Sequence, residues 1–251
     1  MNDIQAVIFD LGDTLIYFEA VLQDVLAEAD ETLFQSLLGK GVALEKEAFL
    51  QEYRSRMSAY FEERNSEFIE HTTFYVLGEV LKVFGFTSLP EGVLRSALRD
   101  MYTVFEKYWI PEAEAVAVLQ ALQGRGYRLG LVSNAADDED VQTLVDKAAI
   151  RPYFDRIITS AVAGIRKPNP RIFQPLFQDW NLRPEKVAMV GDTLGADILG
   201  ARNAGMFGIW VTRRADNAGN RAHRDTIFPD AAVAKLSELP DLLDELRRSG
   251  S

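Results

Sequence analysis

Four segments of the sequence place polar side chains directly after short apolar runs. Asp10 follows AVIF, Ser133 follows YRLGLV, Asp192 follows KVAMVG, and the loop AGIRKPNP contains Lys167. Carboxylate oxygens are ligands that suit Mg²⁺, and a lysine can neutralise a bound anion. A carboxylate held beside Mg²⁺ and a lysine stays ionised and can act as a covalent nucleophile, as in aspartyl-phosphate chemistry. This combination of side chains indicates a site for an anionic ligand.

The apolar runs have the length and composition of buried strands. Helical patterns such as EAEAVAVLQALQ, DVQTLVDKA and ADILGARNA separate the later ones. This alternation predicts βαβ units and an α/β fold, with a Rossmann-like, doubly wound parallel sheet. Ligands bind outside the carboxyl ends of the strands in such sheets, where the four polar segments converge. The expected strands are AVIF (6–9), YRLGLV (127–132), RIIT (156–159), KVAMV (186–190) and GIWV (208–211).

Residues 17–111 form a long interruption between the first expected strand and the second. The pattern is helical throughout, with breaks at LGKG, FGF and LPEG, and acidic residues outnumber basic ones. The segment is too long for a connection within a βα unit. We therefore expect an inserted all-α cap domain at 17–111, on an α/β core formed by 1–16 and 112–251. No basic cluster within this segment marks a multiply phosphorylated substrate.

Composition narrows the class of protein. The 251 residues carry a formal net charge of −11, which argues against nucleic acid or an anionic membrane as partner. The absence of cysteine excludes disulfides and thiolate metal sites. No apolar stretch approaches the roughly 20 residues of a membrane-spanning helix, and no export signal is visible. We expect a cytoplasmic protein, monomeric or homodimeric, that binds a small molecule.

Four motifs in order resemble those of the haloacid dehalogenase (HAD) superfamily of hydrolases. IFDLGDTL resembles the first motif, LVSNA the second, GIRKPNPRIF the third and VGDTLGADILGARNAG the fourth. The likeness spans nearly the whole chain, and the helical insertion is similar to that of members with a cap between motifs one and two. The resemblance implies a Mg²⁺-dependent phosphohydrolase acting on a small phosphorylated metabolite.

The resemblance also implies roles around the phosphate. Asp10 would be the nucleophile that takes the phosphoryl group. Ser133 and the neighbouring backbone would bind phosphate oxygens, as would Asn134. Lys167 would neutralise charge between the nucleophile and the phosphate.

A second set of implied roles concerns the metal. Asp192 would hold Mg²⁺ together with Asp10 and the backbone carbonyl of Gly12. Asp197 would support the water shell of the metal or Lys167. Taken alone, a carboxylate in the first turn of a helix is common and favoured by the helix dipole.

One position departs from the family pattern. Phosphatases of the superfamily typically carry an aspartate two residues after the nucleophile as general acid and base, and this chain has Gly12 there. Asp13 follows where the family often has Gly, Asn or Asp, so we interpret it as a turn residue rather than a displaced acid. General acid–base help is worth about a hundred- to ten-thousandfold in rate. The enzyme should be slow, be confined to good leaving groups, or take the acid from the cap.

Three functions therefore remain open. The first is a Mg²⁺-dependent phosphatase with low activity. The second is a dehalogenase- or phosphonatase-like hydrolase, and a phosphonatase would need a cap lysine; the candidates are Lys40, Lys46, Lys82 and Lys107. The third is a non-catalytic binding protein.

The substrate-lining residues expected from the sequence leave the first motif directly. Tyr17 and Phe18 follow it within a few residues, at the start of the cap. Specificity in such proteins lies in the loops grafted on the fold, so these two aromatic side chains are plausible contacts for a substrate.

Overall fold

A computed structural model describes residues 4–249 of the chain. Its centre is a six-stranded sheet in the order β5-β4-β1-β6-β7-β8, in which every neighbouring pair is parallel. The predicted α/β fold is confirmed. The strands are β1 (Ala6–Phe9), β4 (Arg128–Ser133), β5 (Arg156–Thr159), β6 (Val187–Gly191), β7 (Phe207–Val211) and β8 (Ala231–Val233).

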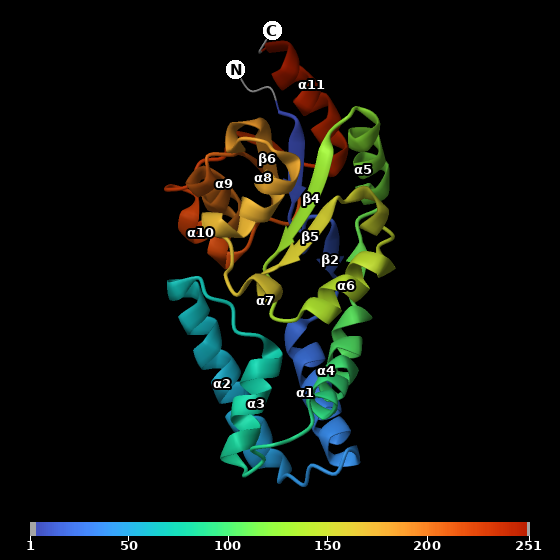
Figure 1. Cartoon of the computed structure of the whole chain (residues 1–251), viewed down its shortest axis with the longest axis vertical. Coiled ribbons are helices and arrows are strands. Elements are labelled where there is room, and N and C mark those ends of the chain that lie inside the picture. The colour runs from blue at the N-terminus through green and yellow to red at the C-terminus, as the bar shows by residue number, and fades with distance from the viewer. Residues whose placement is uncertain (1–3, 250–251) are drawn as a thin grey trace.

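Helices cover both faces of this sheet because its strands are apolar on both sides (Figure 1). In β1, Val7 and Phe9 pack into one cluster while Ala6 and Ile8 pack into the other. The first cluster includes α5, α6 and α11, and the second includes α8 and α9. The helices of this part are α5 (Ala115–Gly124), α6 (Asp138–Lys147), α7 (Ser160–Ala163), α8 (Gln174–Trp180), α9 (Leu199–Ala204), α10 (Ala218–His223) and α11 (Leu239–Ser249).

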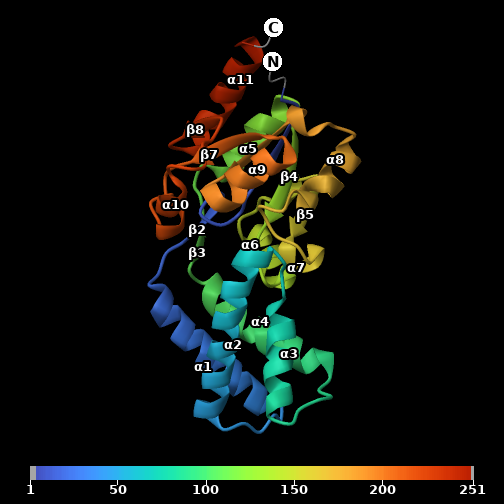
Figure 2. The same cartoon turned by 90° about the vertical axis from the view of Figure 1, so that its left-hand side faces the viewer.

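The inserted segment is a bundle of four helices with a core of its own. Figures 1 and 2 show it at the end of the molecule opposite both termini, beyond the carboxyl ends of β4 and β5. Its buried side chains include Leu33, Phe49, Leu77 and Leu98, one from each helix. The helices are α1 (Leu22–Gly39), α2 (Lys46–Glu67), α3 (Thr73–Val83) and α4 (Glu91–Glu106).

A two-stranded antiparallel ribbon connects this bundle to the sheet domain. β2 (Ile16–Phe18) leaves the first motif, and β3 (Trp109–Pro111) returns the chain to the core. The sequence did not predict this ribbon, whose strands have three residues each and lack a periodic pattern. The proposed domain division falls inside β2 at 16/17 and directly after β3 at 111/112.

A second junction is made by the segment between α2 and α3. Ile69 and Ile165 form an antiparallel bridge, with hydrogen bonds from Glu70 N to Gly164 O (3.1 Å) and from Arg166 N to Phe68 O (3.1 Å). Thr73 N donates to Ala136 O (2.9 Å), in the loop after β4. The cap backbone is thus bonded to the loops that follow motif two and precede Lys167.

The expected helix over 196–204 is shorter than its pattern. A wide turn at Leu194–Ile198 precedes α9, and Thr193 N donates to Asp197 Oδ2 (2.9 Å) within it. None of the helices in residues 4–249 is both long and apolar enough to span a bilayer.

Candidate active site

Lys167 joins two carboxylates at the carboxyl edge of the sheet. Its Nζ donates to Asp10 Oδ1 at 2.6 Å, to Asp197 Oδ1 at 2.7 Å and to the carbonyl of Val132 at 2.7 Å. The side chain is 2% exposed, so all its donors are satisfied inside the protein. Burial alone would lower the pKa of Lys167, but Asp10 and Asp197 outweigh that effect and raise it. The lysine is a fixed positive charge beside the predicted nucleophile.

Asp192 comes from the end of β6, next to β1. Its backbone carbonyl accepts hydrogen bonds from Asn220 Nδ2 (2.9 Å) and Trp210 Nε1 (2.7 Å). Asn220 is fully buried and also accepts from Leu194 N (2.7 Å), so one amide holds both ends of this loop. This role could not be predicted from the sequence, because Asn220 lies in a polar stretch without strand or helix periodicity.

Gly191 is required by the approach of Asp197. A Cβ atom at this position would lie 2.3 Å from Cγ and Oδ2 of Asp197. No side chain fits in that space. Glycine at position 191 therefore lets the Asp197 carboxylate reach both Lys167 and the backbone N–H of Thr193.

Three buried carboxylates meet at this edge of the sheet. Asp10, Asp192 and Asp197 each have an oxygen within 4.8 Å of the other two. Burial, opposed by Lys167 and reinforced by Asp197, raises the pKa of Asp10 to about 6. Burial, and then the charges of Asp197, Asp10 and Asp13, raise the pKa of Asp192 to about 8. Three carboxylates and one lysine leave an excess of negative charge, and these hard oxygen donors fit a divalent cation such as Mg²⁺.

Ser133 and Asn134 lie at the end of β4 and line the same cavity, of about 340 Å³. Asn134 has a structural use in addition to its predicted one. Its Oδ1 accepts from Lys167 N (2.8 Å) and its Nδ2 donates to Lys167 O (2.9 Å). This pair of bonds orients the backbone that presents Lys167, whereas Ser133 is buried and faces the cavity.

Gly12 and Asp13 also line the cavity, and each has a steric feature that the sequence could not show. Asp13 has a φ of +55°, which supports its interpretation as a turn residue. Gly12 has no positive φ, but a Cβ there would lie 3.3 Å from Cη2 of Trp109. A side chain at position 12 would therefore contact the Trp109 indole closely, and the indole would have to shift by a few tenths of an ångström.

The expected lining residues Tyr17 and Phe18 are not among the residues that line the cavity. The Phe18 ring packs against Trp109 (5.2 Å between centroids), and Tyr17 lies beneath the guanidinium of Arg214 (3.8 Å). The aromatic residue that lines the cavity is Trp109, from the opposite strand of the ribbon. The sequence did not indicate Trp109, because β3 lies about ninety residues further along the chain than the first motif.

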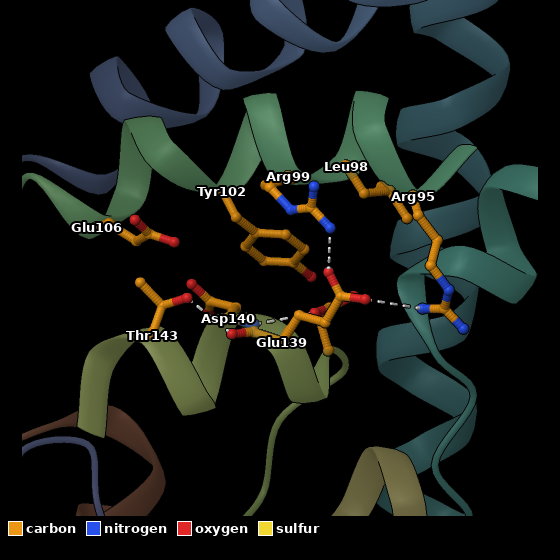
Figure 3. Close-up of a pocket in the computed structure, with 9 residues that line it drawn as sticks. Arg95, Leu98, Arg99, Tyr102, Glu106, Glu139, Asp140 and Thr143 are labelled. Atoms are coloured by element: carbon orange, nitrogen blue, oxygen red, sulfur yellow. Dashed lines mark hydrogen bonds and ion pairs between the residues drawn. The ribbon is translucent and has the colours of Figure 1, made fainter. Parts of the chain in front are cut away.

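Figure 3 shows the seam between α4 of the cap and α6 of the core. Glu139 forms ion pairs with Arg99 (2.9 Å) and Arg95 (3.8 Å) across it. Asp140 lines both this seam and the active-site cavity, and its buried Oδ1 has no hydrogen-bond partner. Burial, with the charges of Glu106 and Asp137, raises the pKa of Asp140 well above its ordinary value. This carboxyl holds its proton more tightly than an exposed aspartate.

Comparison with known proteins agrees with this geometry. Residues 4–205 match the model of the haloacid dehalogenase-like hydrolases. The chain belongs to this family. The predicted resemblance is thereby confirmed, and the protein is a HAD hydrolase.

Two of the relatives that it matches are named phosphatases. A glyceraldehyde 3-phosphate phosphatase of Methanothermobacter thermautotrophicus is 30% identical over 96% of this chain and 100% of its own. A phosphoserine phosphatase of Thermus thermophilus is 30% identical over 86% of this HAD hydrolase and 96% of its own length.

Solved structures show the same fold at lower identity. A HAD phosphatase from Thermococcus onnurineus has a TM-score of 0.63 and 20% identity, covering 96% of this chain and 98% of its own. A 2-haloacid dehalogenase from Pseudomonas syringae pv. Tomato has a TM-score of 0.66 and 23% identity, covering 97% and 99%.

Proposed function

We propose that this HAD hydrolase is a Mg²⁺-dependent phosphatase of small phosphorylated metabolites that works through an aspartyl-phosphate intermediate. The observation that carries the proposal is Lys167 Nζ, held 2.6 Å from Asp10 with Asp192 and Asp197 close by. The named relatives, phosphatases of glyceraldehyde 3-phosphate and of phosphoserine, support the substrate class. On the sequence evidence given above, we further propose a cytoplasmic enzyme that is monomeric or homodimeric.

The side chains divide the work of phosphoryl transfer. Asp10 attacks phosphorus through one carboxylate oxygen while the P–O bond to the leaving group breaks on the opposite side, and the departing alkoxide or phenolate takes its proton from solvent. Ser133 binds a phosphoryl oxygen, and Lys167, whose donors are engaged by the protein, supplies a fixed positive charge that neutralises the negative charge between Asp10 and the phosphate. Water then attacks the aspartyl-phosphate and releases inorganic phosphate.

The metal would be held by Asp10, Asp192 and the carbonyl of Gly12. When bound, Mg²⁺ neutralises carboxylate and phosphate charge and thereby lets the anionic nucleophile approach an anionic group. Asp197 acts on Lys167, to which it is hydrogen-bonded at 2.7 Å, and this contact orients the lysine.

Gly12 makes this a slow enzyme in our proposal. The usual acid is absent, and Trp109 occupies the adjoining space. Alkyl phosphates, whose leaving groups need a proton, should therefore react more slowly than aryl phosphates.

The alternative of a phosphonatase-like enzyme has no cap lysine to support it. Lys40, Lys46, Lys82 and Lys107 are paired with Asp100, Glu31, Glu79 and Glu28, respectively. Lys167 is the lysine among the described residues that line the cavity.

One assay separates the remaining alternatives. Purified enzyme is incubated with para-nitrophenyl phosphate or 2-chloropropionate, with Mg²⁺ or with EDTA. Phosphate release that requires Mg²⁺ is the expected result. Halide release that persists in EDTA would indicate a dehalogenase, and no release from either compound would favour a binding protein.

A further inference from the structure

Arg166 is a second cation of the active-site cavity, beside Lys167 in the chain. Arg166 lines the cavity together with Asp10 and Asp192. Lys167 spends its three donors on Asp10, Asp197 and Val132, as described above. Among the described residues, Arg166 makes one side-chain ion pair, with Glu70 (Nη1 to Oε2, 3.3 Å). Nη1 is buried without a well-formed hydrogen bond. Most of the donors of this arginine are therefore left for a ligand.

Glu70 holds the Arg166 side chain in place without engaging all of its hydrogen-bond donors. This carboxylate is fully buried and accepts hydrogen bonds from Ser160 Oγ (2.6 Å) and from the Tyr60 hydroxyl. The backbone of Arg166 is fixed by its bond to Phe68 O. An arginine anchored at both backbone and head group loses little entropy on binding, so it is suited to a planar, bidentate anion.

Arg64, at the end of α2, adds positive charge close to Arg166, although it lines a separate cavity of the cap rather than the active-site cavity. Its guanidinium lies over the ring of Phe61 (4.2 Å), and its buried Nε has no hydrogen-bond partner. Burial, and then the charge of Arg166, lower the pKa of Arg64 to about 10. We call Arg64, Glu70 and Arg166 the Arg166 cluster. Two guanidinium groups with one carboxylate leave an excess of positive charge, which an anion would relieve.

We propose that Arg166, supported by Arg64, binds a carboxylate of the substrate while its phosphate lies at Asp10 and Lys167. The substrate class is then phosphomonoesters of hydroxy acids. A carboxylate matches the forked geometry of arginine and the single remaining positive charge of the cluster. This inference rests on the proposed phosphatase function and narrows its substrates.

Matched pairs of substrates test the carboxylate. Phosphoglycolate is compared with ethyl phosphate, and 3-phosphoglycerate with glycerol 3-phosphate, at one Mg²⁺ concentration. Within each pair, the ratio of kcat/KM gives the preference for the carboxylate, whatever the absolute rate. Charge-assisted hydrogen bonds of this kind are worth about ten- to hundredfold in binding.

The variants are Arg166→Gln, Arg166→Lys and, as a matched control, Arg171→Gln, which removes an exposed arginine five residues further on. We expect Arg166→Gln to lower the carboxylate preference about ten- to hundredfold, chiefly through KM, and Arg166→Lys to lower it less. Arg171→Gln should retain the parent preference. Because Arg166→Gln leaves Glu70 without its ion pair, the double variant Glu70→Gln/Arg166→Gln is measured alongside and should lose the preference equally.

Failure of the proposed function and failure of the carboxylate site give different results. A parent that hydrolyses none of the four esters with Mg²⁺ would contradict the proposed function. A parent that hydrolyses them with a preference unchanged in folded Arg166→Gln and in the double variant would overturn the carboxylate site and leave the phosphatase proposal standing.

Discussion

The consecutive residues Arg166 and Lys167 belong to clusters with opposite imbalances of charge. Lys167 is a single cation among the buried carboxylates Asp10, Asp192 and Asp197. Arg166 and Arg64 share a single buried carboxylate, Glu70. The first cluster is incomplete without a cation, and the second without an anion. A phosphorylated acid brought in with Mg²⁺ would balance both, so the comparison links the metal to the substrate.

The largest effect on the negative cluster should come from its nucleophile. Asp10→Asn keeps the size of the side chain but removes the attacking carboxylate, so phosphatase activity should fall to background. Thermal unfolding and circular dichroism check that the variant is folded. Substantial phosphate release by folded Asp10→Asn would exclude the covalent mechanism.

Removing a metal ligand should come next. Asp192→Ala is expected to lose Mg²⁺ binding in isothermal titration calorimetry, along with most of its activity. EDTA should silence the parent, and added Mg²⁺ should restore it. Asp179→Ala is a control, since Asp179 pairs with Arg156 on the surface. Unaltered Mg²⁺ affinity in Asp192→Ala would place the metal elsewhere.

Adding a carboxyl group at position 12 should raise the phosphatase rate by an amount that depends on the space left by Trp109. Gly12→Asp places a carboxyl two residues after the nucleophile, but its Cβ meets Trp109 at 3.3 Å. We expect a larger gain in Gly12→Asp/Trp109→Leu than in Gly12→Asp, greater for alkyl than for aryl phosphates. The ceiling is about a hundred- to ten-thousandfold.

Trp109→Leu alone is the control for position 12, because it opens the space without adding an acid. If the double variant changes aryl and alkyl rates equally, another group already supplies the proton. Asp140→Asn would then show whether that group is Asp140.

The smallest expected effect is on stability as a function of pH. The folded metal-free protein holds the pKa of Asp10 near 6 and that of Asp192 near 8, above the ordinary value of 3.8. A carboxyl whose pKa is raised on folding stabilises the protein at low pH, and this contribution is lost as the pH rises through the folded value. In EDTA, the Tm of the parent should fall between about pH 4 and about pH 8 relative to that of Asp192→Asn. Mg²⁺ should reverse the fall. Parallel Tm curves in EDTA would contradict the raised pKa of Asp192.

The sequence was sufficient to predict the active-site residues that directly follow a strand. Asp10, Ser133 and Asp192 each follow a strand directly, so the parallel sheet alone brings them to one edge. The five expected strands are present to within a residue at each end, and the family assignment is confirmed. β8 was missed because three residues carry no periodic signal.

The positive cluster could not be predicted in the same way. Arg64 and Arg166 lie about a hundred residues apart, one in the cap and one in the core. The two arginines come close together because Ile69 pairs with Ile165, and no local sequence pattern predicts that pairing. Trp109 likewise comes close to Gly12 only because β3 pairs with β2. The sequence alone therefore could not show that a side chain at position 12 would contact an indole.

The backbone bonds between the cap and the site loops have an evolutionary consequence. Residues 70, 73 and 166 contribute main-chain N–H groups, and every amino acid except proline has one. The exposed side chains of Phe68 and Ile69 can therefore be exchanged without breaking these backbone bonds, whereas the Glu70 side chain is needed to hold Arg166. A lineage with this architecture can explore new substrates through the lining of its cap while the reacting groups keep their positions, and proline is the substitution that such exploration should avoid.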